Sequence, residues 1–410
     1  MSQSILSVTQ LLPEARQVTV AALAEAMHAK TAARQTPDHT AQAFCTTLSR
    51  LLLQDARARQ YPDLQALGFW LRPANVERML VNYLSAPPGC LAQPMGTVFM
   101  IPPANVDALF GYALAIALLC GNNVIIRLPS TETAAQATLC ALTGDAIAQH
   151  PLLRQRLVLV RYGHDDAVTT ALSQFCALRL VWGGDATVSK LAQIPLPPLA
   201  RQIGFGDRFS ASVIDAAAYG AASEETRTVL MKNFYNDVYW YDQLACAAPR
   251  LLFWLGHAQD CVEFCTQLDT EARRRGYQPD AGASVAKLSL DYLALHDLPA
   301  EDYTVYSPAL STITCRDTAS IASFKRVNYG YGILIVCPVT SLDAIAAQAS
   351  PHDQTLTHWG LSPEKATALV QACSGRGYDR FVPVGQALQF DPVWDGHNLF
   401  AAMTKLVQVG

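Results

Sequence analysis

Short apolar segments alternate with longer helix-like segments through the first half of this chain, and this rhythm constrains the fold more than any other feature. Strands that are apolar throughout, such as 124–126, suit a sheet that is covered on both faces. Strand–helix alternation is typical of a doubly wound parallel sheet, which binds ligands at the carboxyl ends of its strands. We expect strands at 97–101, 123–127, 157–161, 178–182 and 210–215, and helices at 108–119, 133–149, 166–174, 186–194 and 224–239.

The length of 410 residues exceeds that of a typical single domain, so we expect two domains of the α/β class. The first would span 1–222, begin with a mostly helical part up to about residue 90, and regain about 376–410. The second would span 223–375. We expect this second domain to contain a strand at 251–254, a helix at 258–275 and a strand at 333–337.

Composition excludes several classes of protein. Hydrophobic residues make up 51% of the chain and charged residues 16%, which excludes a disordered chain or a coiled coil. The net charge of -4 offers no basic field for a nucleic acid. The longest apolar run, 108–120, is shorter than the roughly 20 residues that span a bilayer. Residues 1–4 lack the features of a signal peptide, and the 11 cysteines form no CxxC pair. We therefore expect a cytoplasmic protein with reduced cysteines, no structural metal, no nucleic-acid partner and no membrane span.

Two motifs carry residues that suit acyl chemistry. Cys246 stands in Asp-Gln-Leu-Ala-Cys-Ala-Ala-Pro, between a long helix and a strand, where a thiolate could meet a substrate. By composition alone, Cys246 does not stand out from the other ten cysteines, which suit packing. Asn105 closes the segment Ile-Pro-Pro-Ala-Asn. Its amide could donate to a developing oxyanion, or it could cap the helix that follows.

Two further motifs suit a nucleotide. Arg127 and Ser130 follow a predicted strand, a place that suits phosphate or ribose, although a solvated surface arginine is the simpler alternative. Trp182-Gly183-Gly184 places glycines at a strand–helix turn, where the backbone can approach a pyrophosphate. Each of these motifs is weak evidence when taken singly.

In this order the four motifs resemble the aldehyde dehydrogenase superfamily. They resemble more closely the long-chain acyl-CoA reductases of the bacterial luciferase fatty-acid reductase complex. The nucleophile loop of those reductases is similar to Asp-Gln-x-x-Cys-x-x-Pro, which Asp242, Gln243, Cys246 and Pro249 match here. The segments Val-Gly-Gln-Ala-Leu at 384–388 and Trp-Asp-Gly at 394–396 are also typical of that branch. The resemblance runs from about residue 90 to residue 410.

The resemblance implies a Rossmann-like NADPH-binding domain at 1–222 and an α/β catalytic domain at 223–375. Cys246 would be the acyl-accepting nucleophile, and Asn105 would donate to the oxyanion. NADPH is expected in preference to NADH because Thr131 stands where NAD-preferring relatives carry a carboxylate, although Glu132 follows it. The residues implied in cofactor binding are Pro103, Arg127, Ser130, Trp182, Gly183, Gly184, Gly204 and Tyr329.

Two departures from the aldehyde dehydrogenase pattern concern water activation. The glutamate of Glu-Leu-Gly-Gly, which activates water in aldehyde-oxidising members, is matched by Gln202, and a second glutamate falls near Val327. Both losses favour thioester chemistry over hydrolysis.

We therefore expect NADPH-dependent reduction of an acyl thioester to an aldehyde. The acyl donor would be acyl-CoA, a carrier-protein-bound acyl thioester, or an acyl group passed from an acyl-protein synthetase subunit. The oligomeric state stays open, with a homo-oligomer as one alternative. Two alternative functions are a CoA-acylating aldehyde dehydrogenase and a non-catalytic scaffold for acyl transfer. An NADPH-oxidation assay with acyl-CoA discriminates the scaffold from the enzymes.

Overall fold

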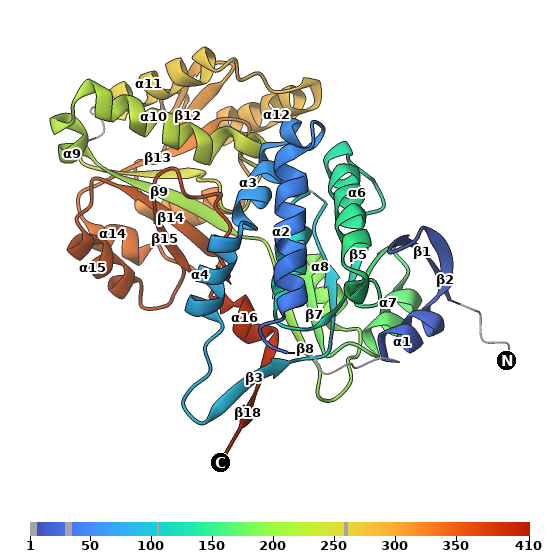
Figure 1. Ribbon diagram of the computed structural model, residues 1–410. Coiled ribbons are helices and arrows are strands. Elements are labelled where there is room, and N and C mark those ends of the chain that lie inside the picture. Colours follow the sequence, from blue (N-terminus) through green and yellow to red (C-terminus); the bar gives the residue numbers. More distant parts are fainter. Residues whose placement is uncertain (1–5, 29–34, 105, 258–260) are drawn as a thin grey trace. The chain divides into compact units, whose positions relative to one another are not determined.

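The computed structural model describes residues 6–28, 35–104, 106–257 and 261–410 (Figure 1). The chain forms two compact units. Unit 1 consists of residues 1–206 and 390–410, and unit 2 of residues 207–389. Each unit is built around one seven-stranded, mostly parallel sheet with helices packed on it. The α/β class that the sequence predicts is confirmed.

The sheet of unit 1 has the strand order β2-β1-β6-β5-β4-β7-β8. The five strands from β6 to β8 are parallel, whereas β1 is antiparallel to β6 and β2 is antiparallel to β1. Strands β1, β2 and β8 were not predicted; β1 and β2 lie in the first 90 residues, for which the sequence predicts mostly helix. The strands are β1 (Ser7–Leu12), β2 (Arg16–Thr19), β4 (Thr97–Ile101), β5 (Asn123–Leu128), β6 (Leu157–Arg161), β7 (Leu178–Trp182) and β8 (Arg201–Phe205).

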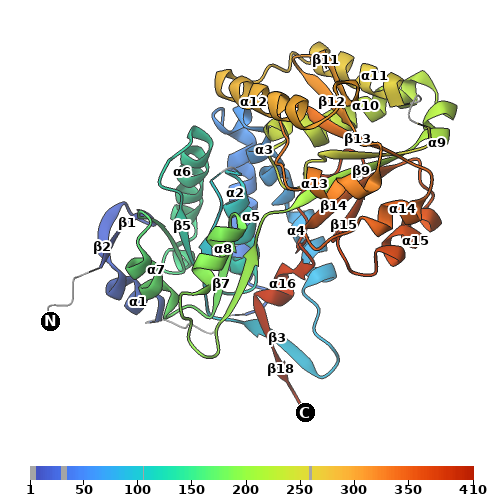
Figure 2. The same cartoon turned by 180° about the vertical axis from the view of Figure 1, so that it is seen from behind.

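Helices cover both faces of this sheet. Helices α1, α7 and α8 lie together on one side of unit 1 (Figure 2), and their apolar side chains form one core with Phe99, Ile125 and Val160. On the other face, α5 packs on β5, and α2 packs on α5 and α6. Every residue of α5 is buried, which explains its apolar run. None of the helices in the described ranges combines the length and hydropathy needed to cross a bilayer. The helical segments are α1 (Val20–His28), α2 (His39–Gln54), η1 (Ala58–Gln60), α3 (Pro62–Trp70), α4 (Pro73–Tyr83), α5 (Leu109–Leu119), α6 (Ala134–Gln149), η2 (Pro151–Leu153), α7 (Asp166–Ser173) and α8 (Asp185–Ala192).

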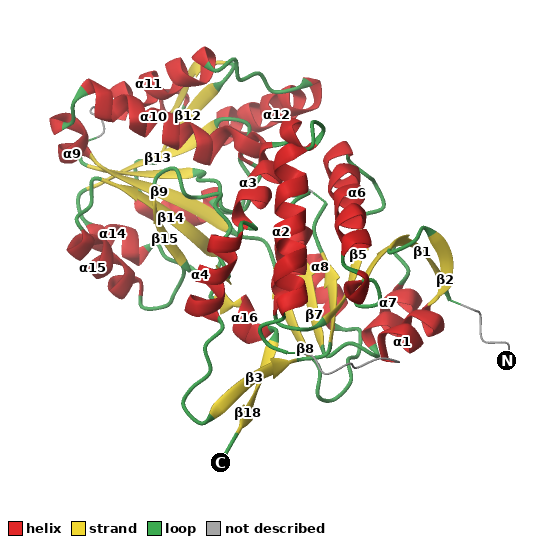
Figure 3. Ribbon diagram, viewed as in Figure 1, coloured by secondary structure: helices red, strands yellow, loops and turns green. Residues whose placement is uncertain are grey.

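The segment 390–410 completes unit 1. Its strand β18 (Thr404–Gln408) pairs antiparallel with β3 (Cys90–Pro94) in a two-stranded ribbon (Figure 3). The buried Asn122 side chain donates from Nδ2 to the Met403 carbonyl oxygen at 2.8 Å. The chain therefore returns to unit 1 at residue 390, not at about 376. The remaining elements here are β16 (Val393–Trp394), β17 (His397–Asn398) and α16 (Leu399–Ala402).

The sheet of unit 2 has the order β11-β12-β13-β10-β9-β14-β15, and only β11 is antiparallel to its neighbour. Strand β9 corresponds to the predicted strand 210–215, which the sequence analysis assigned to the first domain. It pairs with β10 and β14, so unit 2 begins at residue 207 instead of 223. The strands are β9 (Phe209–Asp215), β10 (Leu251–Leu255), β11 (Tyr303–Ser307), β12 (Leu310–Thr314), β13 (Ile333–Val339), β14 (Asp353–Trp359) and β15 (Arg380–Pro383).

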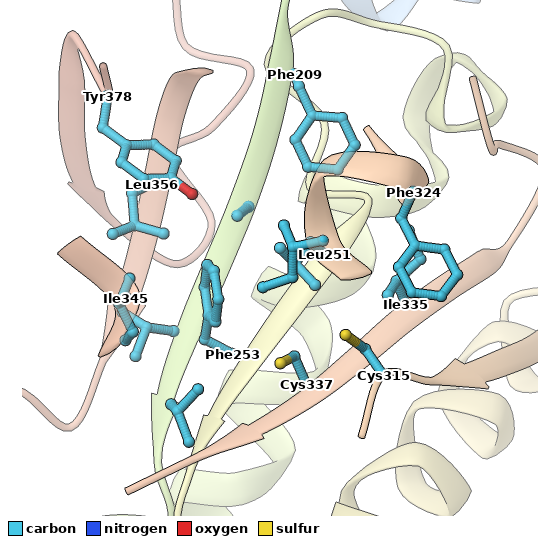
Figure 4. Packing of buried hydrophobic residues seen from close by; sticks show 14 of the residues in the cluster. Phe209, Leu251, Phe253, Cys315, Phe324, Ile335, Cys337, Ile345, Leu356 and Tyr378 are labelled. Carbon is cyan, nitrogen blue, oxygen red and sulfur yellow. The ribbon is translucent and has the colours of Figure 1, made fainter. Parts of the chain in front are cut away.

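Alternate side chains of these strands fill two cores. Val213, Leu251 and Ile335 pack towards α13, α14 and α15 (Figure 4), whereas their neighbours Ile214 and Leu252 pack towards α10 and α11. Each such buried side chain contributes roughly 1.5–3 kcal/mol of hydrophobic stabilisation. The helical segments of unit 2 are α9 (Ala216–Ala221), α10 (Glu224–Tyr239), η3 (Trp240–Gln243), α11 (Cys261–Arg274), α12 (Ala281–Asp297), η5 (Ala300–Asp302), η6 (Thr318–Ser320), α13 (Ile321–Phe324), α14 (Leu342–Ala347) and α15 (Pro363–Cys373).

Candidate active site

The nucleophile loop, residues 240–250, connects helix α10 to strand β10 and carries Cys246. At its start, Tyr241, Asp242 and Gln243 have φ angles of 58°, 53° and 63°. Residues with side chains rarely adopt this left-handed conformation, which costs roughly 1–2 kcal/mol per residue. Three such residues in a row must therefore be held in place by contacts from the rest of the unit.

Gln243 supplies two of these contacts. Its side chain is fully buried, and its Nε2 donates to the Pro249 carbonyl oxygen at 2.9 Å. Its Oε1 accepts a hydrogen bond from the Gly332 backbone N–H at 3.1 Å. One side chain thus ties the start of the nucleophile loop to its end and to the segment before β13. Removing either bond would leave a buried polar group unsatisfied, at a cost of about 1–3 kcal/mol.

The backbone on both sides of Cys246 is also fixed. The Asp242 carbonyl accepts from the Tyr331 N–H at 2.8 Å, and its Oδ1 accepts from the Tyr277 hydroxyl at 2.9 Å. The Ser210 hydroxyl donates to the Cys246 carbonyl oxygen at 2.7 Å. The residues that the motif shares with the long-chain reductases, Asp242, Gln243 and Pro249, are therefore those that shape the loop.

Burial distinguishes Cys246 from most of the other cysteines. Cys246, Cys90 and Cys140 are half-buried, whereas the remaining eight are buried. Burial raises the pKa of the Cys140 thiol to about 12, which keeps it protonated. The pKa of Cys315 is lowered by a hydrogen bond with Cys337, but Cys315 is only 1% exposed inside the core (Figure 4). Cys246 therefore combines partial exposure with a position in a shaped loop.

In unit 1, Trp182, Gly183, Gly184 and Gly204 lie together. Trp182 is paired with Phe205 in the β7–β8 register, and their rings stack at 4.7 Å. The Gly183 N–H donates to the Phe205 carbonyl oxygen at 3.1 Å. Gly204 faces Val188 of α8 so closely that a Cβ would lie 2.4 Å from Val188 Cγ1. The exposed Gly184 is the N-cap of α8, whose first N–H groups can bind an anion.

The other predicted cofactor residues of unit 1 stand at the same edge of the sheet. Pro103 follows β4, and Arg127 and Ser130 lie at the end of β5; both strands run parallel to β7 in the same sheet. The Arg127 guanidinium lies 4.9 Å from the centre of the Tyr162 ring and donates to the Gly163 carbonyl at 3.2 Å. Its buried Nε has no partner, and Ser130 is exposed.

Glu132, the carboxylate that complicates a preference for NADPH, is ion-paired with Arg161 at 2.7 Å. Its negative charge is therefore partly compensated. Three features of this region fit a dinucleotide. They are the glycine backbone at the N-terminus of α8, the unused donor of Arg127 and the exposed hydroxyl of Ser130. Within the described ranges no group of His, Cys, Asp and Glu is arranged to hold a metal ion.

The remaining predicted residues are Asn105, Tyr329, Gln202 and Val327. Asn105 lies outside the described residues, so its role stays a prediction. The Tyr329 side chain is 4% exposed in the core of unit 2, and its role at a cofactor stays a prediction. Gln202 Oε1 accepts from the buried Arg179 at 2.7 Å, and Val327 packs against the core.

The two C-terminal motifs have structural roles. The N–H groups of Gly385 and Ala387 donate to the buried Asp237 carboxylate at 2.6 and 3.0 Å. This fixes segment 384–388 to α10, the helix that leads into the nucleophile loop. Asp395 and Gly396 have φ angles of 48° and 75°, as the tight turn between β16 and β17 requires.

Sequence reasoning gave no function to Gln243 or Arg250. Gln243 is part of the Asp-Gln-x-x-Cys-x-x-Pro motif, so the sequence places it near Cys246. Its two hydrogen bonds could not be predicted, because they form only when Pro249 and Gly332 are folded around it. Arg250 directly precedes β10 and is 3% exposed. A charged residue beside a run of apolar strand residues was the signal that could have identified it.

Comparison with solved structures defines the class of the fold. The chain is similar to a putative aldehyde dehydrogenase from Burkholderia cenocepacia, with a TM-score of 0.68 and 14% identity over 95% of this chain and 91% of that one. It is similar to an NAD-dependent aldehyde dehydrogenase from Sinorhizobium meliloti, with a TM-score of 0.70 and 13% identity over 95% of this chain and 85% of that one. The fold is therefore that of the aldehyde dehydrogenases.

Within this class, the chain belongs to the Acyl-CoA reductase (LuxC) family, whose sequence profile matches residues 77–407. The long-chain acyl-protein thioester reductase of Aliivibrio fischeri is 27% identical over 173 residues, which cover 40% of this chain and 33% of that relative. The matching segment thus spans about a third of the relative's length. The family resemblance that the sequence predicts is confirmed.

Proposed function

We propose that this protein reduces an acyl thioester to an aldehyde, with Cys246 as the acyl acceptor and NADPH as the hydride donor. The observation that carries the proposal is the nucleophile loop, which holds a half-buried cysteine in a chain of the acyl-CoA reductase family. The acyl donor would be acyl-CoA or an acyl group on a carrier protein or synthetase subunit.

The chemistry proceeds through the sulfur of Cys246. Its thiolate attacks the carbonyl carbon of the thioester, and the donor thiol leaves, so that the acyl group becomes bound to Cys246. When bound, NADPH supplies a hydride to that carbonyl carbon. The hemithioacetal on Cys246 then collapses, releasing the aldehyde and regenerating the thiolate. By the resemblance, Asn105 would stabilise the oxyanion.

The residues proposed to hold NADPH belong to unit 1. The N–H groups at Gly183 and Gly184 would face the pyrophosphate, and Arg127 would pair with the 2′-phosphate of the adenosine ribose. The compensation of Glu132 by Arg161 supports NADPH over NADH. By the resemblance, Tyr329 would lie near the nicotinamide ribose.

The residues at the two positions matched to water-activating glutamates, Gln202 and Val327, support reduction over hydrolysis. A positioned general base contributes roughly 10²–10⁴-fold to such a step. Gln202 is neutral at physiological pH and its oxygen is engaged by Arg179, while Val327 cannot accept a proton. The acyl group on Cys246 should therefore survive until a hydride or a thiol reaches it.

The test is aldehyde oxidation by NADP⁺ with and without CoA. We expect slow turnover in buffer and a sharp acceleration by CoA, with acyl-CoA as the product. Mass spectrometry identifies the product, and free CoA without aldehyde is the control. Equally fast oxidation without any thiol, yielding free carboxylic acid, would show that another group activates water and that the thioester proposal is wrong.

A further inference from the structure

The start of strand β9 carries a serine, Ser210, that is fully buried and stands at an irregularity of the sheet. The register between β9 and β14 shifts by one residue at this point, so that Ser210 lies opposite two residues, Gln354 and Thr355. The Thr355 backbone N–H donates to the Ser210 hydroxyl oxygen at 3.2 Å. Such β-bulges are over-represented next to active sites, where they redirect a side chain.

The donor and acceptor roles of the Ser210 hydroxyl are fixed by its neighbours. The Thr355 N–H can only donate, so the hydroxyl oxygen accepts from it, and the hydroxyl proton is directed at the Cys246 carbonyl oxygen, which lies 2.7 Å away. The Ser210 carbonyl oxygen in turn accepts from the Arg250 backbone N–H at 3.0 Å. Ser210 therefore joins two strands of the sheet, β14 and β10, to the peptide group of the proposed nucleophile.

Cys246 is a central residue of a tight turn. The turn spans 245–248 and is closed by the Ala248 N–H, which donates to the Ala245 carbonyl oxygen at 3.0 Å. The peptide group between Cys246 and Ala247 takes no part in this closing bond, and the two main types of β-turn differ chiefly by a rotation of that central group. Its oxygen is the Cys246 carbonyl oxygen, so the bond from Ser210 holds the peptide that the closing bond leaves free to rotate.

We infer that Ser210 is a positioning residue, whose hydroxyl sets the ψ angle of Cys246 and thereby the place of its sulfur. This inference rests on the proposed role of Cys246 as nucleophile. The rotamers open to a side chain depend on its φ and ψ angles. Acyl transfer requires the sulfur within about 3–3.5 Å of the thioester carbonyl carbon and in line with its orbitals. Ser210 exchanges no proton with the substrate: it acts only through the backbone of Cys246.

A second serine of β9 provides the matched control. Ser212 is as deeply buried as Ser210, lies two residues further along the same strand, and places its hydroxyl 2.9 Å from that of Thr357 on β14. The variants are Ser210→Ala, Ser210→Thr and Ser212→Ala. Each alanine variant deletes one buried hydroxyl from the same strand, so both should lower the melting temperature. Only Ser210→Ala removes a bond to Cys246.

The experiment measures how fast excess dodecanoyl- or hexadecanoyl-CoA acylates Cys246 in the full-length protein without NADPH, by quenched flow and peptide mass spectrometry. We expect Ser210→Ala to slow acylation about 10²-fold, because displacing a reacting group by about 1 Å can cost that much. Ser210→Thr keeps the hydroxyl and should restore most of the rate, and Ser212→Ala should stay near the wild type. Alkylation of Cys246 by iodoacetamide, which needs no aligned thioester, should differ little among the variants.

Two results would overturn this role of Ser210. One is acylation of folded Ser210→Ala at the wild-type rate, which a purely stabilising serine predicts, and the other is an equal loss of rate in Ser212→Ala. If Ser210→Ala does not fold, Ser210→Cys, which fills the same space but donates only weakly, replaces it under the same criteria. Failure of the proposed function has a different signature, because the wild type itself would then form no acyl adduct on Cys246.

Discussion

In unit 1 the candidate cofactor residues stand at the carboxyl ends of parallel strands, whereas in unit 2 the candidate nucleophile stands in a loop that precedes a strand. The first arrangement uses regular structure: strand ends, glycines and the N-terminus of α8. The second uses left-handed backbone at Tyr241–Gln243, held by hydrogen bonds of buried side chains. Changes in unit 1 should therefore affect cofactor binding by moderate factors, and changes in the loop should affect turnover by large ones.

The largest effect is expected from removing the sulfur of the nucleophile loop. Cys246→Ala should abolish thioester reduction, because no acyl group can be held, while the Kd for NADPH stays near that of the wild type. Intact-mass measurement of the wild type with acyl-CoA, in the absence of NADPH, should show one acyl adduct on Cys246. Cys90→Ala is the matched control and should retain activity. An adduct on a different cysteine would contradict the assignment.

The next effect concerns the shape of the loop. Gln243→Ala removes the bonds to Pro249 and Gly332, and a nucleophile displaced by about 1 Å can lose roughly 10²-fold in rate. We expect kcat to fall by about that factor, while KM for NADPH is unchanged. Gln10→Ala, which removes an equally buried glutamine from unit 1, is the control for stability.

If Gln243→Ala and Gln10→Ala lower the melting temperature equally but only Gln243→Ala loses turnover, the difference between the two regions is sharpened. Equal turnover in both variants would contradict the proposed difference between the two regions, because the loop would then keep its shape without Gln243.

A smaller effect is expected at the strand-end region of unit 1. Arg127→Ala should weaken NADPH about tenfold, since hydrogen bonds to charged groups contribute about 1.5–3 kcal/mol, and should leave NADH nearly unaffected. Binding is measured by the quenching of protein fluorescence, and Arg50→Ala on α2 is an exposed control. Equal losses for both cofactors would show that Arg127 does not recognise the 2′-phosphate.

The smallest effect concerns Asp237, which joins α10 to segment 384–388. Burial raises the pKa of Asp237 to about 7, against the lowering effects of the Gly385 and Ala387 N–H groups and of Arg380. The folded state thus binds the proton more tightly than the unfolded chain does. The stabilisation is complete below about pH 4 and is lost as the pH rises towards 7.

Asp237→Asn imitates the protonated carboxyl and should remove this part of the pH dependence. We expect the melting temperature of the wild type, relative to the variant, to fall by a few degrees between pH 4 and pH 8. A difference that is constant over this range would show that Asp237 is ionised throughout.

The sequence predicts strands β4, β5, β6 and β7 of unit 1 and helix α10 well, because their apolar runs and their breaks are local signals. It could not predict the sheet to which β9 belongs, since Ser212 is paired with Thr357, far along the chain. The glycines at 183 and 184 could be predicted from turn chemistry, whereas Gly204, inside β8, was implied only by the resemblance. The bonds of Gln243 and the burial of Arg250 could not, since both depend on tertiary contacts. An aromatic residue such as Tyr329 gives the same local signal in a core as at a ligand.

The insertion of unit 2 between two parts of unit 1 has a consequence for the order of folding during synthesis. All residues of unit 2 have been made once Gln389 is added to the growing chain, but unit 1 still lacks residues 390–410 at that moment. Until Met403 arrives, the Asn122 side chain lacks the carbonyl that it binds in the folded state, and β3 has no β18 to pair with. Domains that fold as units during translation usually do so in chain order. Here the residues of unit 2 are complete before those of unit 1, so unit 1 is the unit whose folding depends on the residues that are made last.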